Sequence, residues 1–122
     1  MSDASYKLRE LRGAEHEKAA ALREIERAKK LERLMLIPEF KELIMQDFIV
    51  DETVRVAEMA GNPGLTPEMR ESAMVMVTGG GHLRRWMKLI LDSAARFSEG
   101  LPELDEAILD MRQELDAMGV ER

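Results

Sequence analysis

The segment MRESAMVMVTGGGHLRRWMKLILDSAARF, residues 69–97, decides the fold of this chain. Apolar or small residues recur in it at alternating steps of four and three, which places them on one side of an α-helix. They are Met69, Ala73, Met76, Gly80, Leu83, Met87, Ile90, Ala94 and Phe97. Because the pattern keeps its phase through the three glycines at 79–81, the sequence predicts one continuous helix there and not a linker.

A second apolar stripe follows, with the same alternation of steps. Gly100 is a residue typical of helix ends and Pro102 of helix starts, so we expect the first helix to end near Ser98 or Glu99 and a last helix to begin at Pro102. Gly119 should mark its end. The stripe of this last helix contains Leu101, Leu104, Ile108, Met111, Leu115 and Met118. Leu104, Ile108, Met111 and Leu115 join the nine residues above as the predicted packing or interface seam.

Residues 3–36 form a long charged segment that also reads as a helix, since it has no proline and many strong helix formers. Its apolar stripe is thin, and several heptad positions carry charges: Glu15, Lys18, Lys29 and Glu32. Such a helix is a poor coiled coil, so it is expected to project into solvent or to lie along a partner. The predicted division is therefore a charged N-terminal helix, 1–37, and a helical body, 38–122.

The middle of the chain alternates helices and turns. Ile37 precedes a proline, which predicts a helix end there, and Pro38 suits the first turn of the next helix. Residues 39–60 are predicted to be helical with a bend near 48–51, where Asp51 could cap a second half. Residues 61–65 (Gly-Asn-Pro-Gly-Leu) predict a turn, and Thr66 caps the following helix. Gly80, on the seam, predicts a close approach by a neighbouring helix, for which the 40–48 segment is the candidate.

Composition agrees with an all-α protein, predicted as an elongated antiparallel helical bundle or hairpin with a long charged N-terminal helix. The 122 residues are 45% hydrophobic and 34% charged. The absence of cysteine excludes disulfides, thiolate catalysis and cysteine-ligated metal sites. No stretch reaches the roughly 18 apolar residues of a membrane span, and the first residues lack the apolar run of a secretory signal. A soluble, cytoplasmic protein without membrane contact is expected.

Residues with catalytic potential are few. His82 has no ligating side chain at the helical spacings that would form a metal pair, and His16, beside Glu15 and Glu17, is interpreted as a solvated side chain. No nucleophile or nucleotide-binding motif is present. We therefore expect no enzymatic activity, no catalytic or metal-binding residues and no cofactor.

Charge is distributed unevenly around a net value of −6. Residues 1–33 carry nine Lys or Arg against seven Asp or Glu, and the remainder carries nine against seventeen. A basic cluster within the acidic part is either a patch for an acidic partner or a solvated face, of which the solvated face is favoured: His82, Arg84, Arg85, Trp86 and Lys88. Candidate nucleic-acid contacts lie near the N-terminus: Arg23, Arg27, Lys29, Lys30 and Arg33.

Three segments resemble those of a group of small tailed-bacteriophage proteins: Leu-Ile-Pro-Glu-Phe-Lys-Glu-Leu-Ile (36–44), Asp-Glu-Thr-Val-Arg-Val (51–56) and His-Leu-Arg-Arg-Trp-Met (82–87). The resemblance spans residues 34–97, about half the chain, as a pattern of helix starts and apolar spacings. Ile37 departs from the Asn that usually precedes the proline in that group, and the tripled glycine is unusual. The resemblance implies virion or packaging functions and brings no catalytic residues with it.

These observations favour a non-enzymatic α-helical interaction protein, a structural or assembly component of a phage virion that acts through helix–helix contacts. Its expected partners are further copies of itself (a homo-oligomer) or a larger virion protein, in the host cytoplasm or the virion. Two alternatives stay open. One is a nucleic-acid-associated packaging or regulatory subunit that uses the basic N-terminal helix. The other is a small inhibitor that binds a host protein through its acidic C-terminal helix.

Overall fold

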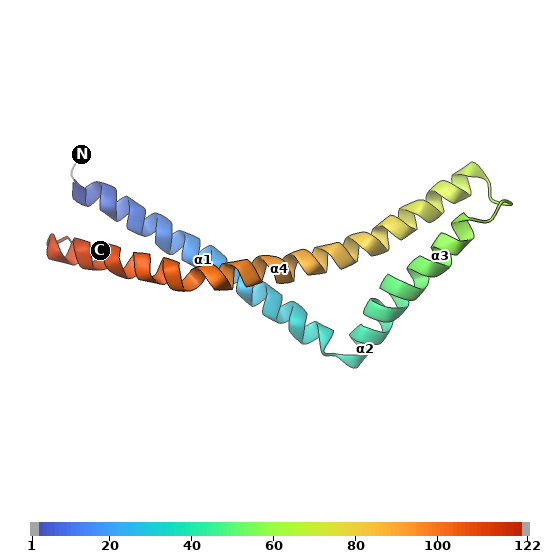
Figure 1. Ribbon diagram of the computed structural model, residues 1–122, viewed down its shortest axis with the longest axis horizontal. Coiled ribbons are helices and arrows are strands. Elements are labelled where there is room, and N and C mark those ends of the chain that lie inside the picture. Colours follow the sequence, from blue (N-terminus) through green and yellow to red (C-terminus); the bar gives the residue numbers. More distant parts are fainter. Residues whose placement is uncertain (1–2, 121–122) are drawn as a thin grey trace. The chain divides into compact units, whose positions relative to one another are not determined.

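The computed structural model describes residues 3–120, and every regular element among them is helical (Figure 1). The elements are α1 (Asp3–Met35), α2 (Pro38–Phe40), the π-helix η1 (Lys41–Glu52), α3 (Thr53–Ala60) and α4 (Pro67–Ala117). The predicted all-α class is confirmed.

The chain forms two compact units, and their boundary differs from the predicted one at residue 37. Unit 1 combines Met1–Ala28 with Asp92–Arg122, and unit 2 is Lys29–Leu91. Helices α1 and α4 each contribute to both units. The N-terminal helix is therefore not a separate part of the molecule, because its portion up to Ala28 packs on the C-terminal segment of the same chain.

Unit 1 is an antiparallel pair of helices, formed by the start of α1 and the end of α4, with the N- and C-termini at the same end (Figure 1). Its core consists of Leu11, Ala14, Ile108 and Leu115, with Leu8, Leu104, Met111 and Val120 packed against it. Leu11 and Leu115 are 1% and 0% exposed. The expectation that the N-terminal helix projects or needs another protein is wrong for this unit: its thin stripe is covered by α4.

Three ion pairs join α1 and α4 in unit 1. Lys7 Nζ lies 2.8 Å from a carboxylate oxygen of Glu114, and Lys18 Nζ lies 2.6 Å from one of Asp105. Arg112 pairs with Glu15 at 3.7 Å. The hydrogen bond to Glu114 raises the pKa of the Lys7 ammonium. Glu15 and Lys18, which weaken the heptad pattern, are thus ion-pair partners of α4 and fix the pairing of the two helices.

Gly119 ends α4, as predicted. Its φ of 72° lies in the left-handed region, which glycine adopts without steric cost. The Gly119 amide donates to the Asp116 carbonyl at 3.0 Å, and the Val120 amide donates to the Leu115 carbonyl at 3.1 Å. These two bonds form the Schellman arrangement, and the Val120 side chain packs on the core that contains Leu115.

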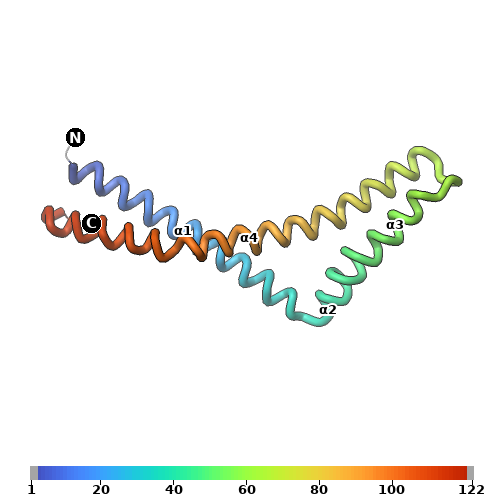
Figure 2. Tube along the Cα trace, in the orientation of Figure 1, coloured from blue at the N-terminus to red at the C-terminus, as the bar shows by residue number. Residues whose placement is uncertain are grey.

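Helix α4 runs without interruption from Pro67 to Ala117, through the glycine triplet and through Pro102 (Figure 2). The predicted continuity across residues 79–81 is confirmed, whereas the predicted break between Ser98 and Pro102 is wrong. Phe97 and Leu101 are four residues apart, so the two apolar stripes share one phase and bury one face of one helix. Pro102 is on the exposed side, where its ring and missing N–H disturb packing least.

In unit 2 the break after α1 is as predicted. Ile37 has φ −75° and ψ 122°, an extended conformation, and Pro38 occupies the first turn of α2. The phase change expected near residues 48–51 is accommodated by η1, whose wider π-helical turns lead directly into α3. Asp51 does not cap a second helix; it accepts a hydrogen bond from the Gln46 amide at 2.9 Å.

The turn at 61–65 and the cap of α4 are confirmed. Asn62 Oδ1 accepts a hydrogen bond from the Gly64 amide at 2.9 Å, an Asx turn. Thr66 Oγ1 accepts one from the Met69 amide at 3.2 Å, which satisfies an otherwise unpaired donor of the first turn.

Gly80 is in close contact with the neighbouring helix, as its place on the seam predicts. An added Cβ at Gly80 would lie 2.5 Å from Thr53 Oγ1, whereas Gly79 and Gly81 have open space around them. The neighbour is the first residue of α3 and not the 40–48 segment. The absence of a side chain at Gly80 therefore permits α3 and α4 to approach each other.

Candidate helix-binding groove

Helix α3 and the first turns of α4 enclose an apolar groove in unit 2, of about 420 Å³. The residues that line it come from both helices and from the turn between them: Arg55, Val56, Met59, Leu65, Glu68, Met69, Ser72, Ala73 and Met76. Val56 and Ala73 are buried and form its floor, at 3% and 6% exposure.

A second hollow of about 260 Å³ adjoins the first. It is lined by Phe48, Glu52, Thr53, Val56, Met76, Gly79 and Gly80. The two hollows share Val56 and Met76, so they form one continuous apolar surface, which we name the α3–α4 groove. Gly80 lets α3 come close to α4, and the open surface beside this contact is the second hollow.

Large apolar side chains of the α3–α4 groove are exposed to solvent. The exposed fractions are 62% for Met76, 54% for Met69, 45% for Met59 and 43% for Phe48. Exposed apolar residues that gather in one concave surface are typical of interaction sites. Methionine adapts its shape to an apolar partner because its side chain is unbranched and polarizable.

The rim of the groove carries an exposed ion pair between Glu52 and Arg55, three residues apart in the chain. Arg55 donates from Nε to Glu52 at 2.9 Å and from Nη2 to the other carboxylate oxygen at 2.5 Å. Arg55 Nη1 also approaches Met59 Sδ at 3.0 Å. The hydrogen bonds from Arg55 lower the pKa of the Glu52 carboxyl. The contribution of this pair is present above the ordinary pKa of Glu and is lost as pH falls through the lowered pKa.

The predicted seam residues of α4 fall into three groups. Ala73, Gly80, Met87, Ile90, Ala94, Ile108 and Leu115 are buried. Leu83, Leu104 and Met111 are partly buried. Met69, Met76 and Phe97 are exposed, and the two methionines line the α3–α4 groove. The seam is thus mainly intramolecular packing, and its first turns contribute to an open surface.

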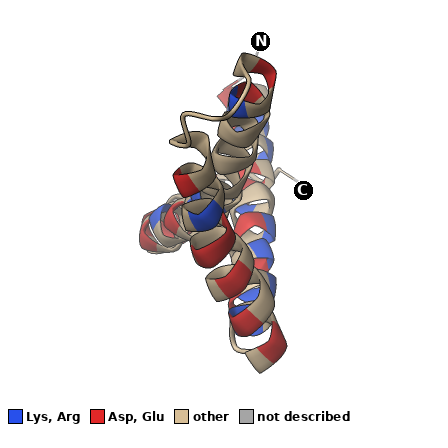
Figure 3. Cartoon of the chain, turned by 90° about the vertical axis from the view of Figure 1, so that its right-hand side faces the viewer, with Lys and Arg blue, Asp and Glu red and all other residues tan. Residues whose placement is uncertain are grey.

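The predicted basic cluster is exposed on α4: His82, Arg84, Arg85, Trp86 and Lys88. The candidate nucleic-acid contacts on α1 are also exposed: Arg23, Arg27, Lys29, Lys30 and Arg33. Arg27 pairs with Glu24 at 3.6 Å. Figure 3 shows basic and acidic positions intermixed on the helices that face the viewer. In α1, Glu24, Glu26 and Glu32 lie among these basic residues, so they form no purely basic stretch.

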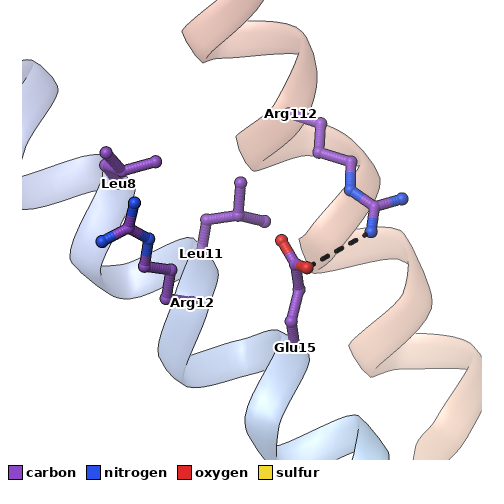
Figure 4. A pocket seen from close by; sticks show the side chains of 5 residues that line it. All are labelled: Leu8, Leu11, Arg12, Glu15 and Arg112. Atoms are coloured by element: carbon purple, nitrogen blue, oxygen red, sulfur yellow. Dashed lines mark ion pairs between the residues drawn. The ribbon is translucent and has the colours of Figure 1, made fainter. Parts of the chain in front are cut away.

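A more polar hollow of about 400 Å³ lies in unit 1, lined by Leu8, Leu11, Arg12, Glu15 and Arg112. Figure 4 shows the Glu15–Arg112 ion pair at one side of it and Leu11 directed toward α4. Its wall is closed by that ion pair, and its apolar lining is the edge of the unit 1 core. It is consequently less suited to an apolar partner than the α3–α4 groove.

The sequence does not identify several residues of the groove, notably Phe48, Arg55, Met59 and Leu65. The sequence gives one indication of the groove. Met69 and Met76 begin the seam, and the chain has few other apolar residues that could pack over them. Among residues 3–120 no group of three Asp, Glu or His lies close enough to hold a metal ion. What the groove offers is apolar surface and shape.

Comparison with known proteins gives no relative: no family model, no curated protein and no solved structure matches this chain. Within the described residues, no helix has the length and apolar character that crossing a membrane requires.

Proposed function

We propose that this chain is a non-enzymatic assembly protein whose α3–α4 groove binds an amphipathic helix of a larger partner. The observation that carries the proposal is the group of exposed apolar side chains in that groove, Phe48, Met59, Met69 and Met76. Packing a helix against them would remove this apolar surface from water, at about 25 cal/mol per Å².

A helix suits this groove because of the spacing of its lining residues. Met69 and Met76 are seven residues apart on α4, about 10.5 Å along the axis at 1.5 Å per residue. Apolar side chains at positions i and i+7 of a partner helix have the same separation, and those at i+3 and i+4 fall between them. The Glu52–Arg55 pair and Glu68 at the rim supply polar contacts at the edge of such an interface.

The setting we propose is the virion or packaging apparatus of a tailed phage, assembled in the host cytoplasm. The resemblance of residues 34–97 to small phage proteins supports it. The proposal of protein partners is favoured over a nucleic-acid role because acidic residues (Glu24, Glu26 and Glu32) are interspersed among the candidate basic contacts of residues 23–33, and Arg27 pairs with Glu24.

Capture of virion proteins by matched variants tests this function. Met76→Glu places a charge in the groove, whereas Met74→Glu places the same charge on an exposed α4 residue that does not line it. The tagged full-length protein is mixed with proteins from disrupted particles of the source phage, and captured proteins are identified by mass spectrometry. We expect Met76→Glu to reduce capture of one virion protein at least tenfold, which is about 1.4 kcal/mol, and Met74→Glu to leave it unchanged.

Two results would contradict the proposal. One is that the wild-type protein captures no virion protein. The other is that both variants capture the partner equally well, which would place the contact outside the groove.

A further inference from the structure

The segments that form the α3–α4 groove are acidic. Its lining residues run from Phe48 to Gly80, and this stretch carries five Asp or Glu and two Arg, a net charge of −3. The acidic residues are Asp51, Glu52, Glu58, Glu68 and Glu71, and the basic ones are Arg55 and Arg70. The groove and these charges all belong to unit 2.

The lining of the groove shows the same excess of negative charge. Arg55 is its basic residue, and a two-point ion pair with Glu52 compensates its charge. Glu68 also lines the groove, is exposed, and forms no ion pair within residues 3–120. The uncompensated charge of the lining is therefore negative.

These exposed carboxylates do not themselves require a partner, because water solvates them. Their effect is on which helix the groove binds most tightly. A helix that packs on Phe48, Met69 and Met76 brings the edges of its apolar face close to the rim of the groove. There, basic side chains are attracted and acidic ones are repelled, which favours one class of helix over the other.

A second copy of this chain is a poor occupant for the same reason. Exposed apolar side chains near the groove, such as Val54, Met74 and Val75, lie on the same acidic stretch. A symmetric contact between two copies of the groove would set two regions of net charge −3 against each other. Like charges would then meet around the apolar contact, so a different molecule suits the groove better.

We propose that the helix bound by the α3–α4 groove is basic, an amphipathic helix with Lys or Arg on both edges of its apolar face. This inference rests on the helix-binding function proposed for the groove and adds the chemical class of the partner. Contact with the exposed methionines gives affinity, since methionine adapts to different apolar surfaces. The acidic rim gives selectivity among amphipathic helices.

The length of the groove sets the length of the partner segment. Glu68 and Gly80, its first and last lining residues on α4, are 12 residues apart, about 18 Å at 1.5 Å per residue. A partner helix therefore needs about three turns to cover it. Isolated helices shorter than about 12–15 residues are marginal in water, so a test peptide must be somewhat longer.

Three synthetic peptides of about 18 residues test the proposal. They share one leucine face, with the spacing i, i+3, i+4 and i+7, and carry Lys, Gln or Glu on the polar face. Isothermal titration calorimetry measures their binding to the full-length protein at about 0.05 M and about 0.5 M salt. We expect the Lys peptide to bind at least tenfold more tightly than the Gln peptide and the Glu peptide to bind most weakly. Higher salt should reduce these differences.

Matched charge reversals locate the contact, because the whole chain is acidic and attracts a Lys peptide over much of its surface. Glu68→Lys reverses a charge of the lining, and Glu106→Lys makes the same change on an exposed residue of unit 1. Glu68→Lys should weaken the Lys peptide at least fivefold and strengthen the Glu peptide, whereas Glu106→Lys should change neither by more than twofold. Met76→Gln should weaken all three peptides. Circular dichroism checks that each variant is folded.

Failure of this inference and failure of the groove give different results. Equal affinity for the three peptides, weakened in each case by Met76→Gln, would retain helix binding in the groove and overturn the basic partner. Equal responses of the Lys peptide to Glu68→Lys and Glu106→Lys would overturn it too, as would no binding of the Lys peptide. A wild-type protein that sediments as a dimer without peptide, and as a monomer with Met76→Gln, would place a second copy in the groove and contradict the proposal.

Discussion

Gly80 and Thr53 show how one missing side chain positions two helices. A Cβ added to Gly80 would lie 2.5 Å from Thr53 Oγ1 but 3.8 Å from Thr53 Cβ, so the hydroxyl alone creates the conflict. Glycine in a helix interior costs roughly 0.8–1 kcal/mol relative to alanine. At Gly79 and Gly81 nothing in the structure offsets this cost, since both have open space.

We accordingly expect opposite effects within the glycine triplet. Gly79→Ala and Gly81→Ala should each raise the free energy of unfolding by up to about 1 kcal/mol, through helix propensity. Gly80→Ala should lower it, because the added methyl group forces Thr53 or α3 to move. Urea denaturation followed by circular dichroism measures all three.

The Gly80→Ala result has its own control in Thr53→Ala. In the double variant the two Cβ atoms would be at an ordinary van der Waals distance, so the gain in helix propensity should reappear. A double-mutant cycle should give a coupling of about 1 kcal/mol or more. Additive effects would show that Thr53 does not constrain Gly80.

At the scale of elements, α4 is where sequence interpretation and structure differ most. Pro102 removes the amide that would bond the Ser98 carbonyl, and a proline in a helix interior costs about 3 kcal/mol. The helix nonetheless continues, because Leu101 and Leu104 keep the phase of the seam and are partly buried on either side of the proline. Tertiary packing of one face outweighs the local preference for a break.

Pro102→Ala should therefore stabilise the protein. It restores a backbone hydrogen bond and removes a steric conflict on an exposed position, for an expected gain of up to about 3 kcal/mol in the free energy of unfolding. Pro67→Ala is the matched control, since proline is favoured in the first turn of a helix and little change is expected there. If Pro102→Ala has no effect, the helix is interrupted at residue 102 in solution, as Gly100 and Pro102 suggest by themselves.

Features that depend on interactions between residues close in sequence are predictable from the sequence, and features that depend on contacts between distant segments are not. The Thr66 cap, the turn at 61–65, the stop at Ile37 and the end at Gly119 depend on backbone chemistry within a few residues, and all are predicted correctly. The continuity of α4 through the glycines follows from a strong periodic pattern. The π-helix and the α3–α4 groove depend on how separate segments meet, and no local pattern reports that.

At the scale of the whole chain, the informative error concerns the N-terminal helix. Its many charges predict a helix that does not pack on the rest of the chain. In unit 1, however, the two ends of the sequence pack together through Leu11, Ala14, Ile108 and Leu115. Three charged residues that interrupt the apolar pattern or flank it pair with α4: Lys7, Glu15 and Lys18. The apolar stripe of α1 is too narrow for a coiled coil between two copies of α1, but it is wide enough to pack against α4 of the same chain.

Two leucines of α1 distinguish a packed N-terminal helix from a projecting one. Leu11 is 1% exposed and Leu22 is 47% exposed. Leu11→Ala leaves a cavity against Ile108 and Leu115 and should cost about 2–5 kcal/mol of unfolding free energy. Leu22→Ala should cost far less, because much of its side chain already contacts water. Chemical denaturation followed by circular dichroism compares the two variants. Equal effects would mean that α1 does not pack on α4, and hence that the two ends of the chain do not fold as one unit.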